Sequence, residues 1–172
     1  AGYTFEIKVS QKEEIYHSTA PDEVVKELSL LKAEDIAKNI GRENVVIIGA
    51  DTVVAHKGKI LGKPKDDGDA FSMIQGIQGD VHFVYTGITI LSFDENGNKT
   101  IVNEAIGTKV FVDYMTEEEI QAYLATGEHR DKAGSYAIQG KFAPYIEKIE
   151  GDYYNVVGLP ISYIRKTLKN LQ

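Results

Sequence analysis

The feature that most constrains the fold is a continuous apolar run, Val45 to Ile48, followed directly by Gly49-Ala50-Asp51-Thr52. Such a run is typical of a central strand covered on both faces of a sheet. We therefore expect a buried strand that ends at Asp51. Ligands of open α/β sheets bind outside the carboxyl ends of strands, so Asp51 is a candidate for chemistry. A simple turn-capping role for this residue is the alternative.

Helical and extended patterns alternate around this strand. Strands are expected at residues 3–9, 81–93, 100–114 and 142–150, with a hairpin over 53–61. Helices are expected from Pro21 to about Asn39, over 66–75, after the capping box Thr116-Glu119 and after Pro160. The pattern shows no repeat or linker, so residues 1–172 form a single domain. We predict an α/β fold with a mixed, twisted sheet flanked by helices.

Composition excludes several classes of protein. The absence of cysteine among the 172 residues excludes disulfides, thiolate catalysis and Cys-ligated zinc, and it is compatible with the cytoplasmic location that we expect. A net charge of −7 argues against a surface for long nucleic acids, although local cations or a metal still allow a small anionic ligand. The sequence contains no apolar run long enough for a membrane span, and no secretory leader is visible.

Lys32 occupies an unusual position in the first expected helix. It follows Leu28 by four residues and Val25 by seven, so it lies on the apolar stripe. A lysine there must either extend to solvent or reach an anionic partner, and the pattern leaves both open.

Other candidates are weaker when each is taken alone. Lys63 lies in the turn Gly62-Lys63-Pro64, where exposed lysines are common. Glu14 belongs to an acidic pair that is usually solvated but can also hold Mg²⁺. The four histidines show no metal-ligand spacing. We interpret His82 as structural.

Residues 131–140 combine charge, small residues and an amide without helix or strand periodicity. Gly134 and Gly140 allow a close approach of the backbone to a ligand. Gln139 offers both a donor and an acceptor, which suits recognition of a base edge.

Taken together, these segments resemble the Maf family. The matching pieces, in order, are Lys32-Ala33, Gly49 to Val54, Ile60 to Pro64, Gly79-x-x-His82-x-Val84-x-Thr86-Gly87, Asp131 to Gly140 and Gly151 to Pro160. They cover nearly the whole chain, and their order makes the set specific. The resemblance implies a two-lobed Maf/ITPase-like fold with a cleft, and a homodimer.

The resemblance also implies a metal-dependent enzyme that cleaves a nucleoside triphosphate into a monophosphate and pyrophosphate. Asp51 would be the catalytic acid that takes a proton from the attacking water. Lys32 and Lys63 would neutralise phosphate charge, and both would converge with Asp51 and Glu14 on a single cleft. Glu14, with Asp51, would help to hold Mg²⁺ or another divalent cation such as Mn²⁺.

Asp131-Lys132-Ala133-Gly134 and Ile138-Gln139-Gly140 resemble the branch of the family that acts on dTTP, UTP and modified uridine nucleotides. Thr52, Lys132 and Gln139 would bind the substrate, and the enzyme would remove nonstandard nucleotides as a housekeeping function. Reported family links to septum formation keep open a second interpretation, a nucleotide-binding regulator of cell division with little or no turnover.

One part of the family pattern is not found. The family opens with a strand, a Ser-x-Ser-Pro-Arg-Arg type loop and a helix that cradle the triphosphate, whereas this sequence starts with Ala1 at a point resembling the second strand. We expect the first strand and helix to be missing from the fold, which would leave one edge of the sheet unpaired.

Overall fold

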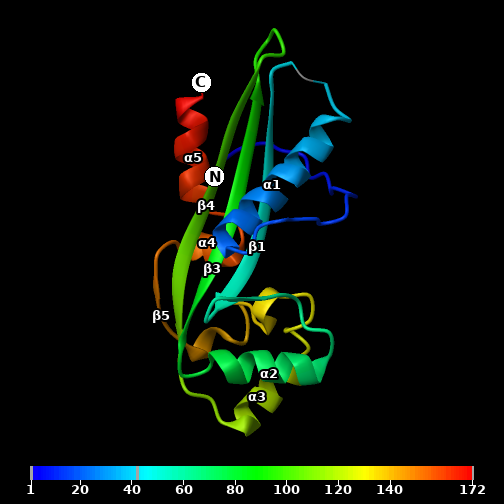
Figure 1. Ribbon diagram of the computed structural model, residues 1–172. Coiled ribbons are helices and arrows are strands. Elements are labelled where there is room, and N and C mark those ends of the chain that lie inside the picture. Colours follow the sequence, from blue (N-terminus) through cyan, green and yellow to red (C-terminus); the bar gives the residue numbers. More distant parts are fainter. Residues whose placement is uncertain (1, 42, 172) are drawn as a thin grey trace.

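The structure is a computed structural model that describes residues 2–41 and 43–171. Its centre is a long, twisted five-stranded sheet with the strand order β2-β1-β3-β4-β5 (Figure 1). The strands are β1 (Val45–His56), β2 (Lys59–Leu61), β3 (Val81–Phe93), β4 (Lys99–Val112) and β5 (Ile146–Glu150). The helices are α1 (Pro21–Ala37), α2 (Asp67–Ile77), α3 (Glu117–Leu124), α4 (Tyr153–Val157) and α5 (Ile161–Asn170), with 3-10 turns at Ala133–Ser135 and Ala143–Tyr145. The prediction of an α/β fold is confirmed.

The prediction of a mixed sheet is wrong, because every pairing between the described strands is antiparallel. Two of the pairs are hairpins. Lys57 and Gly58 close the first with positive φ values of 48° and 76°, as a tight turn requires. Asp94 closes the second by accepting hydrogen bonds from the backbone amides of Asn96 and Asn98. Alternation of helices and strands along the chain suggested crossovers, but hairpin turns reverse the direction of the strands.

The expected end of the buried strand is also wrong. Strand β1 continues through Asp51 to His56, in register with β3 from Val45 opposite Phe93 to Ala55 opposite Phe83. Nor is the apolar run covered on both faces, since Val46 and Ile48 are exposed. Gly49 and Asp51 make no turn, because β3 continues to pair with β1 beyond the point where the hydrophobicity of the strand falls.

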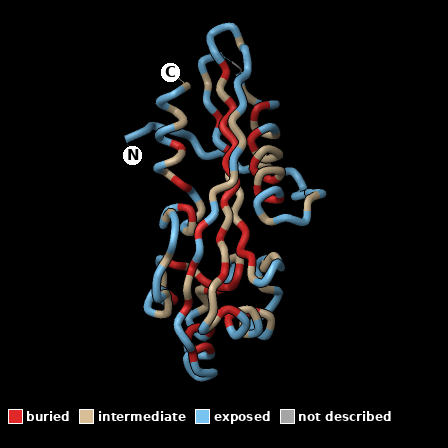
Figure 2. The backbone as a smooth tube through the Cα atoms, turned by 60° about the vertical axis from the view of Figure 1, so that its left-hand side comes forward, coloured by how far each residue is buried: buried red, intermediate tan, exposed pale blue. Residues whose placement is uncertain are grey.

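One edge of the sheet has no partner among the described residues. Strand β2 pairs with β1 only from Val54 onward, so residues 45–53 of β1 contact β3 on one side alone. We call this stretch the free edge of β1. Residues 3–9, predicted to be a strand, have no regular secondary structure and belong to no sheet, and Figure 2 shows this segment as exposed. That prediction is wrong because alternation does not make a strand without a partner to pair with.

Helix α1 lies against β1 and β3 at two glycines. A Cβ added at Gly49 would lie 2.9 Å from the Ala33 Cβ, and one added at Gly87 would lie 2.8 Å from the Lys26 backbone nitrogen and still closer to the Val25 carbonyl. Bare backbone at both positions therefore sets how closely the helix approaches the sheet.

The remaining helices form two lobes along the sheet (Figure 1). Helix α5 covers the face opposite α1, where Ile164 packs on Ile88 and Ile90. Helices α2 and α3 build a second core around Phe142 at the other end. The predicted start of α1 and the capping box of α3 are confirmed, but the strand expected over 142–150 begins only at Ile146. Within the described part of the chain, no helix has the length and apolarity needed to cross a bilayer.

Candidate active site

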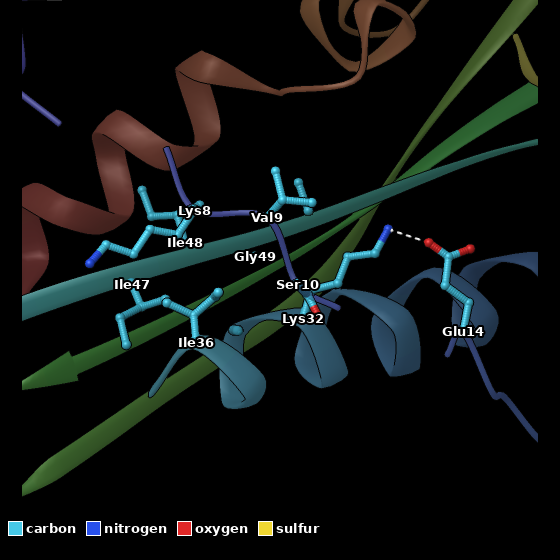
Figure 3. A pocket seen from close by; sticks show the side chains of 11 residues that line it. Lys8, Val9, Ser10, Glu14, Lys32, Ile36, Ile47, Ile48 and Gly49 are labelled. Atoms are coloured by element: carbon cyan, nitrogen blue, oxygen red, sulfur yellow. Dashed lines mark ion pairs between the residues drawn. The ribbon is translucent and has the colours of Figure 1, made fainter. Parts of the chain in front are cut away.

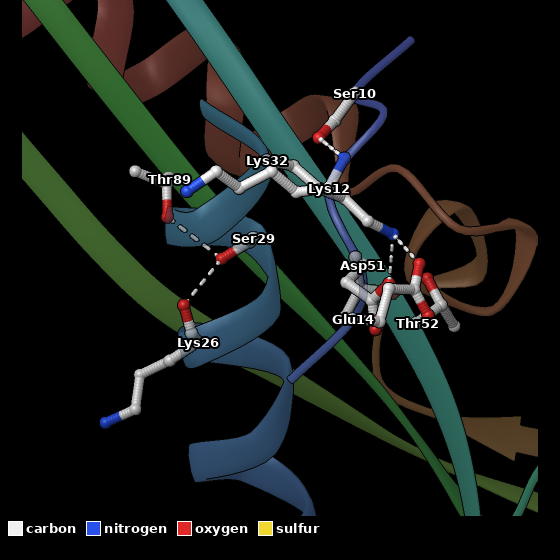
Figure 4. Close-up of polar contacts among 10 residues, drawn as sticks. Ser10, Lys12, Glu14, Lys26, Ser29, Lys32, Asp51, Thr52 and Thr89 are labelled. Atoms are coloured by element: carbon white, nitrogen blue, oxygen red, sulfur yellow. Dashed lines mark hydrogen bonds and ion pairs between the residues drawn. The ribbon is translucent and has the colours of Figure 1, made fainter. Parts of the chain in front are cut away.

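Three of the predicted residues meet on the α1 side of the sheet. The Lys32 Nζ lies 2.5 Å from Oδ1 of Asp51 and 2.8 Å from Oε1 of Glu14 (Figure 4). We call Glu14, Lys32 and Asp51 the carboxylate–lysine cluster. Asp51 is the most enclosed, with 11% of its side chain exposed, against 28% for Lys32 and 58% for Glu14. Lys32 therefore reaches anionic partners from the apolar stripe, which decides between the two interpretations of its position.

The glycine contacts of α1 bring Lys32 and Asp51 together. Asp51 is paired across the ladder with Gly87, on which the backbone of α1 rests. Ala33, the neighbour of Lys32, packs over Gly49, two residues before Asp51. Both contacts fix α1 at a distance from which a lysine side chain spans the gap to the carboxylate. The cluster thus depends on helix–sheet packing and not on local sequence.

Glu14 comes from the irregular segment before α1, and side chains of α1 hold that segment in place. Asp35 accepts a hydrogen bond from the Ser10 hydroxyl at 2.8 Å. Glu27 accepts one from the backbone amide of His17 at 2.7 Å and others from Ser18. These two anchors lie on either side of Glu14, so its carboxylate is carried toward Lys32 although the segment has no regular structure.

Electrostatics distinguish the members of the cluster. Burial raises the pKa of Asp51 above its usual value, and its contact with Lys32 offsets only part of this effect. For Lys32, burial lowers the pKa, but the hydrogen bonds to Asp51 and Glu14 outweigh burial, so the net change is upward. Lys32 is therefore a cation at neutral pH. Asp51 is a carboxylate whose proton affinity is increased, as suits a general base.

A cavity of about 270 Å³ lies beside the cluster (Figure 3). Residues 8–10, Glu14, Lys32 and residues 47–50 at the free edge of β1 line it, with Ala33 and Ile36 of α1. Sites for whole small-molecule ligands usually measure roughly 300–1,000 Å³. The cavity therefore suits one charged portion of a ligand, with the rest extending along β1.

Thr52 lies on the other face of the sheet from Asp51, because consecutive strand residues point to opposite sides. Its hydroxyl is 2.9 Å from the hydroxyl of Thr86 on β3. The segment 131–140 shares this face, since Gly134 packs against the side chain of Val54. The predicted residues thus form two groups, one on each side of β1.

Lys63 belongs to the second group. The Gly134 amide donates to the carbonyl of Gly62 at 3.1 Å, and the Lys63 Nζ lies 3.9 Å from Oδ1 of Asp131. We expected both lysines to converge with Asp51 and Glu14 on a single cleft, but among the described residues Lys63 pairs with Asp131 and makes no ion pair with the cluster. Both partners are largely exposed, so this ion pair is weak and the ammonium is accessible to a ligand.

The loop that carries Lys132 and Gln139 is held by Glu128. Its carboxylate accepts from the Lys141 amide at 2.9 Å, and a Cβ at Gly140 would overlap it. Lys132 and Gln139 themselves are exposed. Glu128 was not among the residues predicted to have a function. Its position eleven residues before Gln139 carries no periodic signal that would have revealed the contact.

The cluster offers two carboxylates to a divalent cation. Glu14 and Asp51 both lie against the same ammonium, so their oxygens converge on one point. Oxygen ligands are those that Mg²⁺ prefers, and it usually keeps several waters or phosphate oxygens beside one or two carboxylates. Within the described chain, no group of three or more His, Cys, Asp or Glu residues is arranged for a metal. Glu14 and Asp51 converge on the Lys32 ammonium, so they could hold a divalent cation only if substrate and water supplied its remaining ligands.

These features define a class: an α/β protein with a basic carboxylate and an ammonium at one side of a strand, and an amide-bearing loop at the other. Such a site could carry out acid–base chemistry on a ligand bound beside the cluster. The family model described as Maf-like protein matches residues 1–171. The chain belongs to the Maf family.

Similar proteins carry a functional name. The chain is 46% identical to the dTTP/UTP pyrophosphatase of Lachnoclostridium phytofermentans, over 98% of this chain and 85% of that protein. It is 47% identical to the dTTP/UTP pyrophosphatase of Alkaliphilus metalliredigens, over 95% and 83% of the two chains. Identity to the protein of that name from Thermoanaerobacter sp. is 48%, over 98% and 86%.

Proposed function

We propose that this protein is a nucleoside triphosphate pyrophosphatase that converts dTTP and UTP to the monophosphate and pyrophosphate. The names of its relatives support hydrolysis over a purely regulatory role. The observation that carries the proposal is the carboxylate–lysine cluster, where Lys32 joins Asp51 and Glu14 beside a cavity.

In the proposed reaction, water attacks the α-phosphorus and Asp51 takes its proton. A new bond forms between the water oxygen and phosphorus, and the bond from phosphorus to the α–β bridging oxygen breaks. Pyrophosphate leaves with the electron pair of that bond. The raised pKa of Asp51 supports its role, because a stronger base accepts the proton more readily.

Charge neutralisation falls to the two lysines. Lys32 would contact the phosphate that enters the cavity, where its ammonium is already held in place by the two carboxylates. Lys63 would contact phosphates from the turn after β2, where it is largely exposed. Phosphoryl transfer depends on positioning and electrostatic stabilisation more than on covalent chemistry, which such cations supply.

A divalent cation, Mg²⁺ or Mn²⁺, would be held by Glu14 and Asp51. When bound, it would neutralise charge on the phosphate oxygens. The base of the nucleotide would lie across the free edge of β1, on the face of Thr52. Lys132 and Gln139 would contact it there from the loop that packs on Val54.

The test is release of pyrophosphate from dTTP and UTP in the presence of Mg²⁺. Asp51→Asn should abolish release and leave nucleotide binding measurable. Glu95→Gln, which removes an exposed carboxylate in the turn between β3 and β4, is the matched control and should keep full activity. Binding without turnover by the unmodified chain would favour the regulatory interpretation instead.

A further inference from the structure

A buried chain of hydrogen bonds runs from the segment after β5 to Thr52. Asn155 on α4 is fully buried, and its backbone carbonyl lies 3.0 Å from the hydroxyl of Thr86. The Thr86 hydroxyl in turn lies 2.9 Å from that of Thr52. This chain connects α4 to a residue next to Asp51, on the face of β1 where the proposed function places the base.

The direction of these hydrogen bonds follows from counting protons. A carbonyl oxygen has no proton, so the contact between Asn155 and Thr86 requires the Thr86 hydroxyl to donate. A hydroxyl carries only one proton, so Thr86 can only accept in its contact with Thr52. Thr52 must therefore donate to Thr86. Thr52 can therefore offer a ligand only the acceptor lone pairs of its hydroxyl oxygen.

The side chain of Asn155 fixes the arrangement. Its Nδ2 donates to the carbonyl of Val84 at 3.0 Å and to the hydroxyl of Thr108 at 2.9 Å. The Val84 carbonyl can only accept, so the amide cannot turn over without placing two acceptors face to face. The Thr108 hydroxyl also donates to the carbonyl of Asp152, which ties the start of α4 to β4. These contacts hold Asn155 in place, with its backbone carbonyl accepting from the Thr86 hydroxyl.

We propose that Asn155, acting through Thr86, makes Thr52 a pure hydrogen-bond acceptor, and that this polarity selects bases with an imide N–H. The inference rests on the proposed function. Thymine and uracil carry an N–H at ring position 3, whereas cytosine has a bare acceptor nitrogen there. An acceptor at Thr52 matches the first two bases and repels the third. Asn155 and Thr86 are positioning residues for this recognition.

The experiment compares kcat/KM for UTP and CTP in the chain and in Thr86→Val, which keeps the shape but removes the hydroxyl. The freed Thr52 proton can then turn toward the base, so the UTP-to-CTP ratio should fall by about 10-fold or more, with CTP improving. Thr89→Val is the control, because it removes a comparable contact, 2.9 Å to Ser29, from the same strand. Its ratio should equal that of the unmodified chain.

A folded Thr86→Val protein with an unchanged ratio would overturn the proposal. If that variant does not fold, Thr52→Ser and Thr52→Val replace it: the serine should keep the preference for UTP, the valine should lose it, and equal ratios in the two would overturn the proposal. The ratio of the dissociation constants for UTP and CTP measures the same discrimination between the two bases without turnover. Lack of pyrophosphate release from UTP would instead refute the proposed function.

Discussion

Gly87→Ala tests whether the active site depends on the approach of α1 to the sheet. Gly87 lies opposite Asp51 in the ladder, and an added Cβ would lie 2.8 Å from the Lys26 nitrogen and nearer still to the Val25 carbonyl. These are backbone atoms, which cannot rotate away. Because the Val25 carbonyl is the nearest obstacle, helix α1 would have to move off the sheet by more than about 1 Å to restore ordinary contact in a close-packed interior.

This movement should affect stability and activity together. Overpacking of this kind costs about 1–3 kcal/mol, and we expect the upper part of that range because the obstacle is backbone. Lys32 moves with α1, away from its 2.5 Å contact with Asp51. Misplacement of a catalytic group by about 1 Å can cost about 100-fold in rate, so kcat/KM for dTTP should fall by roughly 10- to 100-fold.

Urea unfolding and pyrophosphate release measure the two effects. Gly76→Ala is the control, because Gly76 lies on the exposed side of α2 with no atom within 4 Å of an added Cβ. It should gain up to about 1 kcal/mol from helix propensity and keep full activity. A Gly87→Ala protein with the stability and activity of the unmodified chain would refute the claim that bare backbone positions α1.

Three further predictions concern charge. Lys32→Met should lower kcat/KM by about 100-fold or more, because phosphate neutralisation is lost. It should also move the acidic limb of the pH profile to higher pH, because the Lys32 ammonium lowers the pKa of Asp51. An acidic limb at the same pH would contradict the assignment of Asp51 as the base. Burial lowers the pKa of His82 from 6.5 to about 4, so the unfolded state binds more protons between these values. Stability should therefore fall as pH drops through this window, by at most about 3 kcal/mol, and His82→Gln should flatten the dependence in urea titrations at pH 7 and pH 4. Chelation with EDTA should abolish pyrophosphate release, and added Mg²⁺ or Mn²⁺ should restore it. Glu14→Gln should raise the Mg²⁺ concentration needed for activity by about 10-fold, because one metal-ligating carboxylate is lost. An unchanged Mg²⁺ requirement would show that Glu14 does not bind the metal.

Local sequence signals were reliable where a few neighbouring residues decide the conformation. Pro21 and the acids after it marked the start of α1, and Thr116 with Glu119 marked the capping box of α3. The turn at Lys57 and Gly58 was likewise readable. Each of these depends on hydrogen bonds or φ values within one turn of backbone, which the chain carries wherever it folds.

The same signals failed where a distant partner was needed. Residues 3–9 alternate like a strand, but in the described chain no strand lies alongside to complete their hydrogen bonds. Asp51 looked like the end of a strand, but β3 continues to pair with β1 as far as Ala55. Short segments such as α4, which buries only Asn155, gave no recognisable period at all.

The sequence alone determined that Lys32 lies on an apolar stripe, and an ammonium there needs either solvent or an anion. It also determined, through its ordered motifs, the family to which the chain belongs. Only the tertiary structure decided that Asp51 and Glu14 are that anion, that Lys63 lies apart, and that Thr52 faces away from Asp51. The physical reason is that contacts across α1, β1 and β3 join residues far apart in the chain, and their distances are set by how closely helix and sheet can pack.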